Sequence, residues 1–213
     1  SACGTAEELP KPVAATLEAH PAISAERLES VQEDVFDTVQ NADAKLDATM
    51  LDGRTTGPFT QMRGAEYKLK KILADNFGLG RLSTVAQQTV ISPADSYPHA
   101  ALSIMEAPQG TNLQTIDVFQ QETPRDNWML WGVLDILPGA TVPALTVGDE
   151  GAALLDPTSA DGLVASPADV LAAYSSLNDN DDSKGLTFAE DRLRETFASG
   201  KESNKEVVEG AGE

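Results

Sequence analysis

The acidic segment over residues 179–190 has the residue types of a calcium-binding loop at the spacing that such a loop requires. Its oxygen-bearing side chains at the first, third, fifth and twelfth positions of an EF-hand loop are Asp179, Asp181, Ser183 and Glu190. The position that needs glycine for its sharp turn is Lys184, however, and the glycine falls one place later. Two interpretations follow: a weak Ca²⁺ site, or an acidic linker between two helices with Thr187 as the next N-cap. We expect no cofactor, with Ca²⁺ as the alternative.

Familiar catalytic arrangements are missing from the sequence. The only histidines are His20 and His99, and neither lies near a Gly-x-Ser-x-Gly turn or a partner cysteine. Phosphate-binding glycine loops and zinc-ligand spacings are also absent. Asp117 and Asp135 fall on neighbouring predicted strands and could face one another, but with 34 acidic residues such a pair is expected by chance. We therefore predict that the protein is not an enzyme.

Two tryptophans on one strongly apolar segment are the candidate surface for a ligand or partner. Trp128 and Trp131 fall within residues 127–137, a run of strand-forming residues. Because positions three apart on a strand have opposite parity, one ring should face the core and the other the opposite side of the sheet. Packing explains both rings, whereas a ring exposed at the mouth of the fold would be the wall of an apolar pocket.

The single cysteine, Cys3, lies in Ser1-Ala2-Cys3-Gly4. A bacterial lipobox ends in a short run of small or apolar residues before a cysteine that becomes diacylated, and Ser1-Ala2-Cys3 resembles its last three positions. We expect Cys3 to carry lipid that anchors the protein to the outer face of the cytoplasmic membrane, the alternative being a chance sequence with an idle thiol. No apolar run approaches the ~18 residues of a membrane-spanning helix, so the lipid would be the only membrane attachment.

The charge balance argues against nucleic acid as a partner. The chain has 15 Lys and Arg against 34 Asp and Glu, a net charge of −19. Binding to a polyanion needs clustered cations, and the nearest cluster, Lys68, Lys70 and Lys71 beside Arg63, is typical of a solvated helix face. The expected partner is therefore an unknown envelope protein or a small apolar ligand.

Hydrophobic periodicity predicts two helices before a group of strands and two after it. The helices are expected over residues 24–47, 58–75, 166–178 and 187–199. In the second helix the apolar stripe consists of Phe59, Met62, Ala65, Leu69, Ile72 and Leu73. The candidate strands lie over residues 84–91, 99–106, 112–121 and 127–137. Turn residues at 108–111 and 123–126 predict that the last three strands form an antiparallel meander.

These elements predict an α+β fold: a cystatin-like cone in which long N-terminal helices pack on a curved antiparallel sheet of about four strands, followed by a C-terminal helical segment. Composition divides the chain further. The expected parts are a lipid-anchor tether over 1–22, the cystatin-like domain over 23–145, an irregular linker over 146–165, a helical pair over 166–200 and a flexible tail over 201–213.

Short motifs along residues 24–197 resemble lipoproteins of unknown function from actinobacteria, the high-GC Gram-positive bacteria. The residues that carry the resemblance are Gly57-Pro58 with Arg63 and Ala65-Glu66-Tyr67, Gln121 with Pro124-Arg125, Trp128-Met129-Leu130-Trp131-Gly132-Val133, Leu137-Pro138-Gly139-Ala140-Thr141 with Pro143, and Ser166-Pro167-Ala168-Asp169-Val170-Leu171-Ala172-Ala173-Tyr174. The resemblance implies nuclear-transport-factor-like or cystatin-like α+β domains in two repeats, of which the second, from Ser166, would be incomplete here. It implies no catalytic residues.

Three functions remain open from the sequence. The leading hypothesis is a non-enzymatic binding or scaffold module of the cell envelope. The alternative is a carrier or sensor of a small apolar ligand in a cone-shaped pocket, and a weaker one is a hydrolase or isomerase that uses interior carboxylates. A filled cone would favour the scaffold, an open apolar cavity the carrier, and a cavity with convergent carboxylates the enzyme.

Overall fold

The structure is a computed structural model that describes residues 20–140, 142, 151–152 and 155–210, with residues 203–210 described by backbone alone. Cys3 and nearly all of the predicted tether lie outside the described residues, as do parts of the predicted linker and of the predicted tail. The lipidation of Cys3 and these divisions of the chain therefore stay predictions.

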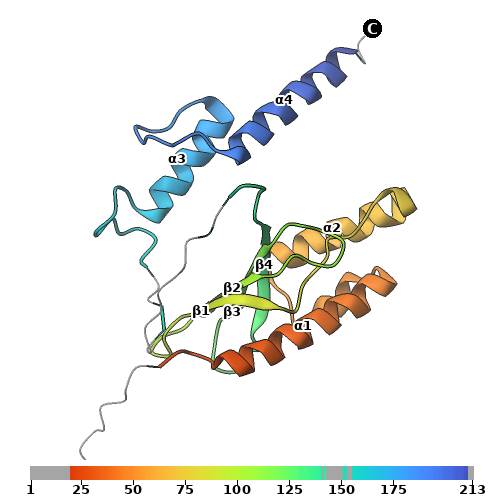
Figure 1. Cartoon of the computed structure of the whole chain (residues 1–213), viewed down its shortest axis with the longest axis vertical. Coiled ribbons are helices and arrows are strands. Elements are labelled where there is room, and N and C mark those ends of the chain that lie inside the picture. Colours follow the sequence, from red (N-terminus) through yellow and green to blue (C-terminus); the bar gives the residue numbers. More distant parts are fainter. Residues whose placement is uncertain (1–19, 141, 143–150, 153–154, 211–213) are drawn as a thin grey trace, which may run out of the picture.

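A four-stranded antiparallel sheet packs against two helices (Figure 1). The strands, hydrogen-bonded in chain order, are β1 (Ala86–Ile91), β2 (His99–Met105), β3 (Thr115–Gln121) and β4 (Met129–Asp135). The helices are α1 (Ala25–Lys45) and α2 (Gly57–Leu73) before the sheet, and α3 (Pro167–Asn180) and α4 (Arg192–Gly210) after it. Short 3₁₀ helices follow α1 and α2 at Ala48–Leu51 and Ala74–Asn76. The α+β class and the cystatin-like arrangement predicted from the sequence are confirmed.

The long helix α1 packs against one face of the sheet. Ser24 caps it, because its hydroxyl accepts a hydrogen bond from the backbone N–H of Arg27. Its buried apolar residues are Leu28, Val35, Val39 and Ala42. They belong to one core cluster with Ala101, Phe119 and Leu130 of the sheet. The helical periodicity of this segment therefore marks the face that packs on the strands.

Helix α2 buries a different stripe from the predicted one. Phe59, Arg63 and Tyr67 are buried, whereas four members of the predicted stripe are 42–77% exposed. These exposed side chains are Met62, Leu69, Ile72 and Leu73. The buried stripe faces α1 because the Tyr67 hydroxyl donates a 2.7 Å hydrogen bond to Asp43 Oδ1, and Arg63 pairs with the same carboxylate. Polar partners on α1, together with the core packing of Phe59 and Tyr67, set the rotation of α2.

One extra residue in β4 sets which of its side chains face the helices. Phe119 of β3 pairs with Leu130, and the adjacent Val118 pairs with Gly132, so Trp131 is the unpaired residue of a β-bulge. Beyond the bulge the alternation of side chains is shifted by one place, because the period of a strand is two. Leu130 and Val133, three apart in sequence, therefore share the core side of the sheet.

The connection between α1 and α2 is attached to β4 and places α2 beside it. The Leu130 N–H donates to the Arg54 carbonyl at 3.0 Å, and the Thr56 N–H donates to the Leu130 carbonyl at 2.9 Å. At the start of α2, Gly57 has a φ of +56°, and a Cβ there would lie 2.7 Å from the Trp131 ring. Glycine is required because the bulged tryptophan lies against this turn.

Helices α3 and α4 lie apart from the cone and contact each other (Figure 1). Ser166 caps α3, as predicted, by accepting from the Asp169 N–H at 3.1 Å. Helix α4 begins at Arg192 rather than after Thr187. The reason is Asp191, whose carboxylate accepts hydrogen bonds from the Arg194 backbone, the Arg194 guanidinium and the Tyr174 hydroxyl. The helix also continues to Gly210, beyond its predicted end at residue 199.

Candidate functional site

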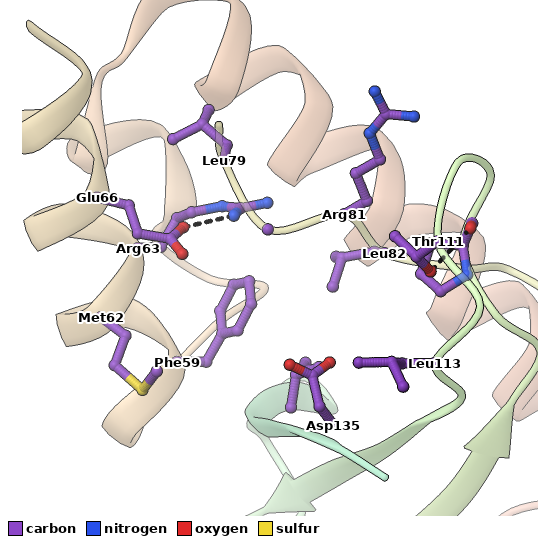
Figure 2. Close-up of a pocket in the computed structure, with 13 residues that line it drawn as sticks. Phe59, Met62, Arg63, Glu66, Leu79, Arg81, Leu82, Thr111, Leu113 and Asp135 are labelled. Carbon is purple, nitrogen blue, oxygen red and sulfur yellow. Dashed lines mark hydrogen bonds and ion pairs between the residues drawn. The ribbon is translucent and has the colours of Figure 1, made fainter. Parts of the chain in front are cut away.

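A pocket of about 320 Å³ lies between α2, residues 79–82, the connection before β3 and the end of β4 (Figure 2). Its apolar wall consists of Phe59, Met62, Leu79, Leu82, Leu113 and Val133. The Phe59 ring, Leu82 and Leu113 point into the cavity from three different sides (Figure 2). A volume of this size is at the lower end of the ~300–1,000 Å³ typical of small-molecule sites.

One face of α2 supplies a third of the lining. Phe59, Met62, Arg63 and Glu66 are spaced by three, four and seven residues, which places them on the same side of a helix. Pro58 lies in the first turn, where its fixed φ favours helix initiation. The attachment of the preceding loop to β4 then holds this face over the sheet.

The buried Arg63 is paired with two carboxylates. Its side chain is 3% exposed, and it donates to Glu66 Oε2 at 2.6 Å and to Asp43 Oδ2 at 3.1 Å. Its Nε lies 3.0 Å from Asp43 Oδ1, close enough for an ion pair but not aligned for a hydrogen bond. Burial raises the pKa of Asp43, an effect that the Tyr67 hydroxyl and the Arg63 charge oppose. Arg63, Asp43 and Glu66 together carry one net negative charge.

Residues 79–82 form a strap between this pocket and a second hollow of about 540 Å³ on the α1 side. Leu79 and Leu82 of the strap line both spaces and pack against the core. The guanidinium of Arg81 donates to the Gln109 carbonyl at 2.5 Å, which ties the strap to the connection between β2 and β3. Figure 2 shows this guanidinium directed away from the cavity.

Asp117 and Asp135, the two aspartates named from the sequence, share the core-facing side of the sheet but differ in environment. Asp117 pairs with Val133 across the strands, and Asp135 pairs with Thr115. Asp117 is 3% exposed and accepts a 2.8 Å hydrogen bond from the Thr115 hydroxyl. Burial raises the pKa of Asp117 to about 7, and the Thr115 hydroxyl opposes this shift. Only Asp135 reaches the pocket, where its carboxylate points into the cavity (Figure 2).

Comparison with known proteins places the chain in a family. Residues 19–211 match a family described as a domain of unknown function, DUF8094. The chain belongs to this family. No curated protein and no solved structure matches it.

Neither predicted tryptophan lines the pocket. Trp128 is 7% exposed and stacks on His99 with 6.2 Å between ring centroids, while Trp131 is 39% exposed at the bulge. His99 stacks in turn on Tyr97 at 3.8 Å, and its Nδ1 lies 3.4 Å from Gln121 Oε1. Among the described residues its Nε2 has no hydrogen-bond partner. Trp128 thus packs at the N-terminal end of the sheet's second strand, and Trp131 packs against α2.

The carboxylates of the acidic segment between α3 and α4 do not converge on a common point. Asp179 lies within α3, and Asp181 ends that helix with a left-handed φ of 56°. Lys184 and Gly185 also have positive φ, and the Lys184 N–H donates to Asp182 Oδ1 at 2.9 Å. Within the described parts of the chain, no group of three or more acidic, histidine or cysteine side chains is placed to hold a metal ion. Calcium binding through these residues, with Ser183 and Glu190, stays a prediction.

The pocket lining itself was not predicted from the sequence. Its apolar members come from four separate segments, and only the spacing of Phe59, Arg63 and Glu66 on one helix face is a local signal. The run 78–82 has no apolar periodicity that would mark it as part of a binding wall. Over the described residues, no helix combines the length and apolarity needed to cross a bilayer.

Proposed function

We propose that this DUF8094 domain is a non-enzymatic binding module that holds a small, mainly apolar ligand in the pocket beside α2. The observation that carries this proposal is the cavity of about 320 Å³ and its six apolar side chains (Figure 2). Concave pockets with mostly apolar walls and a few charged groups are the usual form of small-molecule sites. Of the three functions considered from the sequence, an open apolar cavity favours the carrier or sensor.

Binding fits this site better than acid–base catalysis. Glycosidase-type chemistry, for example, needs two carboxyl groups that converge on one substrate bond. Here Asp117 is buried in the protein interior and hydrogen-bonded to Thr115. Of the two aspartates, only Asp135 is directed into the cavity. The nearby Glu66 is held by Arg63 at 2.6 Å. A single free carboxylate supports recognition of a ligand rather than proton transfer between two groups.

A nuclear magnetic resonance screen of the isotope-labelled chain against small apolar molecules tests the proposal. We expect ligands to shift the methyl resonances of Leu82, Leu113 and Val133, because these side chains line the cavity. The substitution Leu113→Trp should abolish binding by filling the space. Leu134→Trp adds the same ring at an exposed position on the opposite face of β4 and should leave binding unchanged.

Binding that survives Leu113→Trp, or no pocket shift with any compound, would overturn the proposal. The second outcome would instead favour the scaffold hypothesis, in which the cone presents its outer surface to an envelope partner. Circular dichroism and thermal unfolding of both variants check that each ring is accommodated without loss of the fold.

We propose that the protein is an actinobacterial envelope lipoprotein that is anchored through Cys3 to the outer face of the cytoplasmic membrane. The support is Ser1-Ala2-Cys3, which resembles a lipobox, and the spaced motifs that resemble such lipoproteins with nuclear-transport-factor-like cones. Mass spectrometry of the N-terminal peptide from native membranes should find a diacylated cysteine. Cys3→Ser should release the protein from the membrane fraction. An unmodified Cys3 in native material would contradict the proposed lipid anchor.

A further inference from the structure

We infer that the ligand of this pocket is a small organic cation, an amine with a short apolar body, whose ammonium group binds the carboxylate of Asp135. The inference rests on the proposed function and specifies its ligand class. It follows from the charges that line the cavity and from which of them already have partners.

Asp135 is the one carboxylate that the pocket leaves unpaired. It lies at the end of β4, exposed, with its oxygen atoms directed into the cavity (Figure 2). Within the described residues its side chain takes part in no ion pair or hydrogen bond. The other carboxylate of the lining, Glu66, is bound to Arg63. A ligand can therefore gain a charge-assisted contact at Asp135 without breaking an existing one.

The two arginines of the lining do not offer a free site for an anion inside the cavity. Arg63 faces two carboxylates, Asp43 and Glu66, so its charge is already more than balanced. The Arg81 guanidinium bonds to the Gln109 carbonyl and points away from the cavity (Figure 2). The chain as a whole carries a net charge of −19, which attracts cations and repels anions during encounter.

The walls next to Asp135 fit an apolar body. Phe59, Leu82 and Leu113 point into the space above the carboxylate (Figure 2). An alkyl or aryl amine can place its carbon atoms against these side chains while its ammonium group remains at Asp135, which is partly in contact with water. Such a pose buries apolar surface without removing a charge fully from solvent.

Three probes of equal length test the charge preference: hexylammonium, hexanol and hexanoate, each titrated into the labelled full chain at low salt. We expect hexylammonium to bind about five times more tightly than hexanol, the gain of a partly exposed ion pair, and hexanoate to bind most weakly. Asp135→Asn should remove the preference for hexylammonium and leave hexanol binding unchanged. Asp37→Asn removes an exposed charge from α1, outside the pocket lining, and should preserve the preference.

The outcomes separate this inference from the proposed function. Equal binding of all three probes, or tightest binding of hexanoate, would leave the pocket in place and overturn the cationic ligand. A preference for hexylammonium that persists in Asp135→Asn would overturn the role of Asp135. Failure of every probe to shift pocket resonances would count against the binding function itself.

Discussion

Asp117 is a buried carboxyl group among neutral hydrogen-bonding side chains. Across the strands it pairs with Ser103, which accepts a 2.9 Å hydrogen bond from Gln32 of α1 and lies 3.1 Å from the Thr89 hydroxyl. Among the described residues no cation bonds to Asp117, so only the hydrogen bond from the Thr115 hydroxyl offsets part of the cost of removing its charge from water. Its pKa is therefore raised to about 7, mainly by burial.

The raised pKa of Asp117 predicts a loss of stability with rising pH. Between about pH 4 and about pH 7 the folded protein holds a proton that the unfolded chain has lost, so the free energy of unfolding falls over this window and is level above it. At about 1.4 kcal/mol per pKa unit, the fall from this group is at most about 4 kcal/mol. In Asp117→Asn, the free energy of unfolding measured in urea should no longer contain this contribution to the pH dependence.

Asp135→Asn is the matched control for this pH dependence, since it removes an exposed aspartate of the next strand. It should keep the fall seen in the original protein. If Asp117→Asn and the original chain lose stability equally over the window, Asp117 is ionised in the folded protein at low pH and the assignment is wrong.

At the scale of elements, the Asp43 carboxylate joins α1 to α2 through Arg63 and Tyr67. Arg63→Met should lower the free energy of unfolding by about 2–3 kcal/mol, because Asp43 and Glu66 lose their shared cation. This loss of stability is smaller than the ~3–5 kcal/mol expected for breaking a fully buried ion pair, because both carboxylates remain partly exposed to water. Thermal or urea unfolding measures the change.

Arg54→Met is the comparison for that experiment. Arg54 also pairs with an aspartate of α1, Asp34, but at the surface, with the two side chains 29% and 56% exposed. Its loss should cost less than about 1 kcal/mol. Equal effects of the two substitutions would show that the Arg63 contacts contribute no more than a surface ion pair.

The helices and strands could be predicted from the sequence because their signals are local. Ser24 and Ser166 cap helices where predicted, and the turns at 108–111 and 123–126 join antiparallel strands. The rotation of α2 could not be predicted, because it depends on Asp43 a helix away. The pocket was missed for the same reason: its walls meet only after the sheet, α2 and the strap are in place.

At the scale of the whole molecule, the cone and the α3–α4 pair are separate in space (Figure 1). The described chain between them touches the sheet at one place, where the Ala152 N–H donates to the Ile91 carbonyl at 2.8 Å. A chain that ends after residue 152 should therefore keep the fold of the cone, with a free energy of unfolding within about 1 kcal/mol of the full chain. Amide spectra of residues 20–140 should superimpose in the two forms.

Collapse of those spectra on truncation would show that α3 and α4 complete the core of the cone. The full chain would then need to be treated as one cooperative unit in every stability measurement. Retention of the spectra would allow the pocket to be studied in the shorter chain.

The bulge at Trp131 makes the register of β4 as informative as its composition. Regular pairing of the same residues without the bulge would restore strict alternation beyond Leu130, turning Val133 and Asp135 to the outer surface and Leu134 inward. The cavity would then exchange its only unpaired carboxylate for an aliphatic side chain. A relative whose fourth strand pairs regularly, without the bulge, would therefore be expected to select uncharged ligands, even if every amino acid were identical.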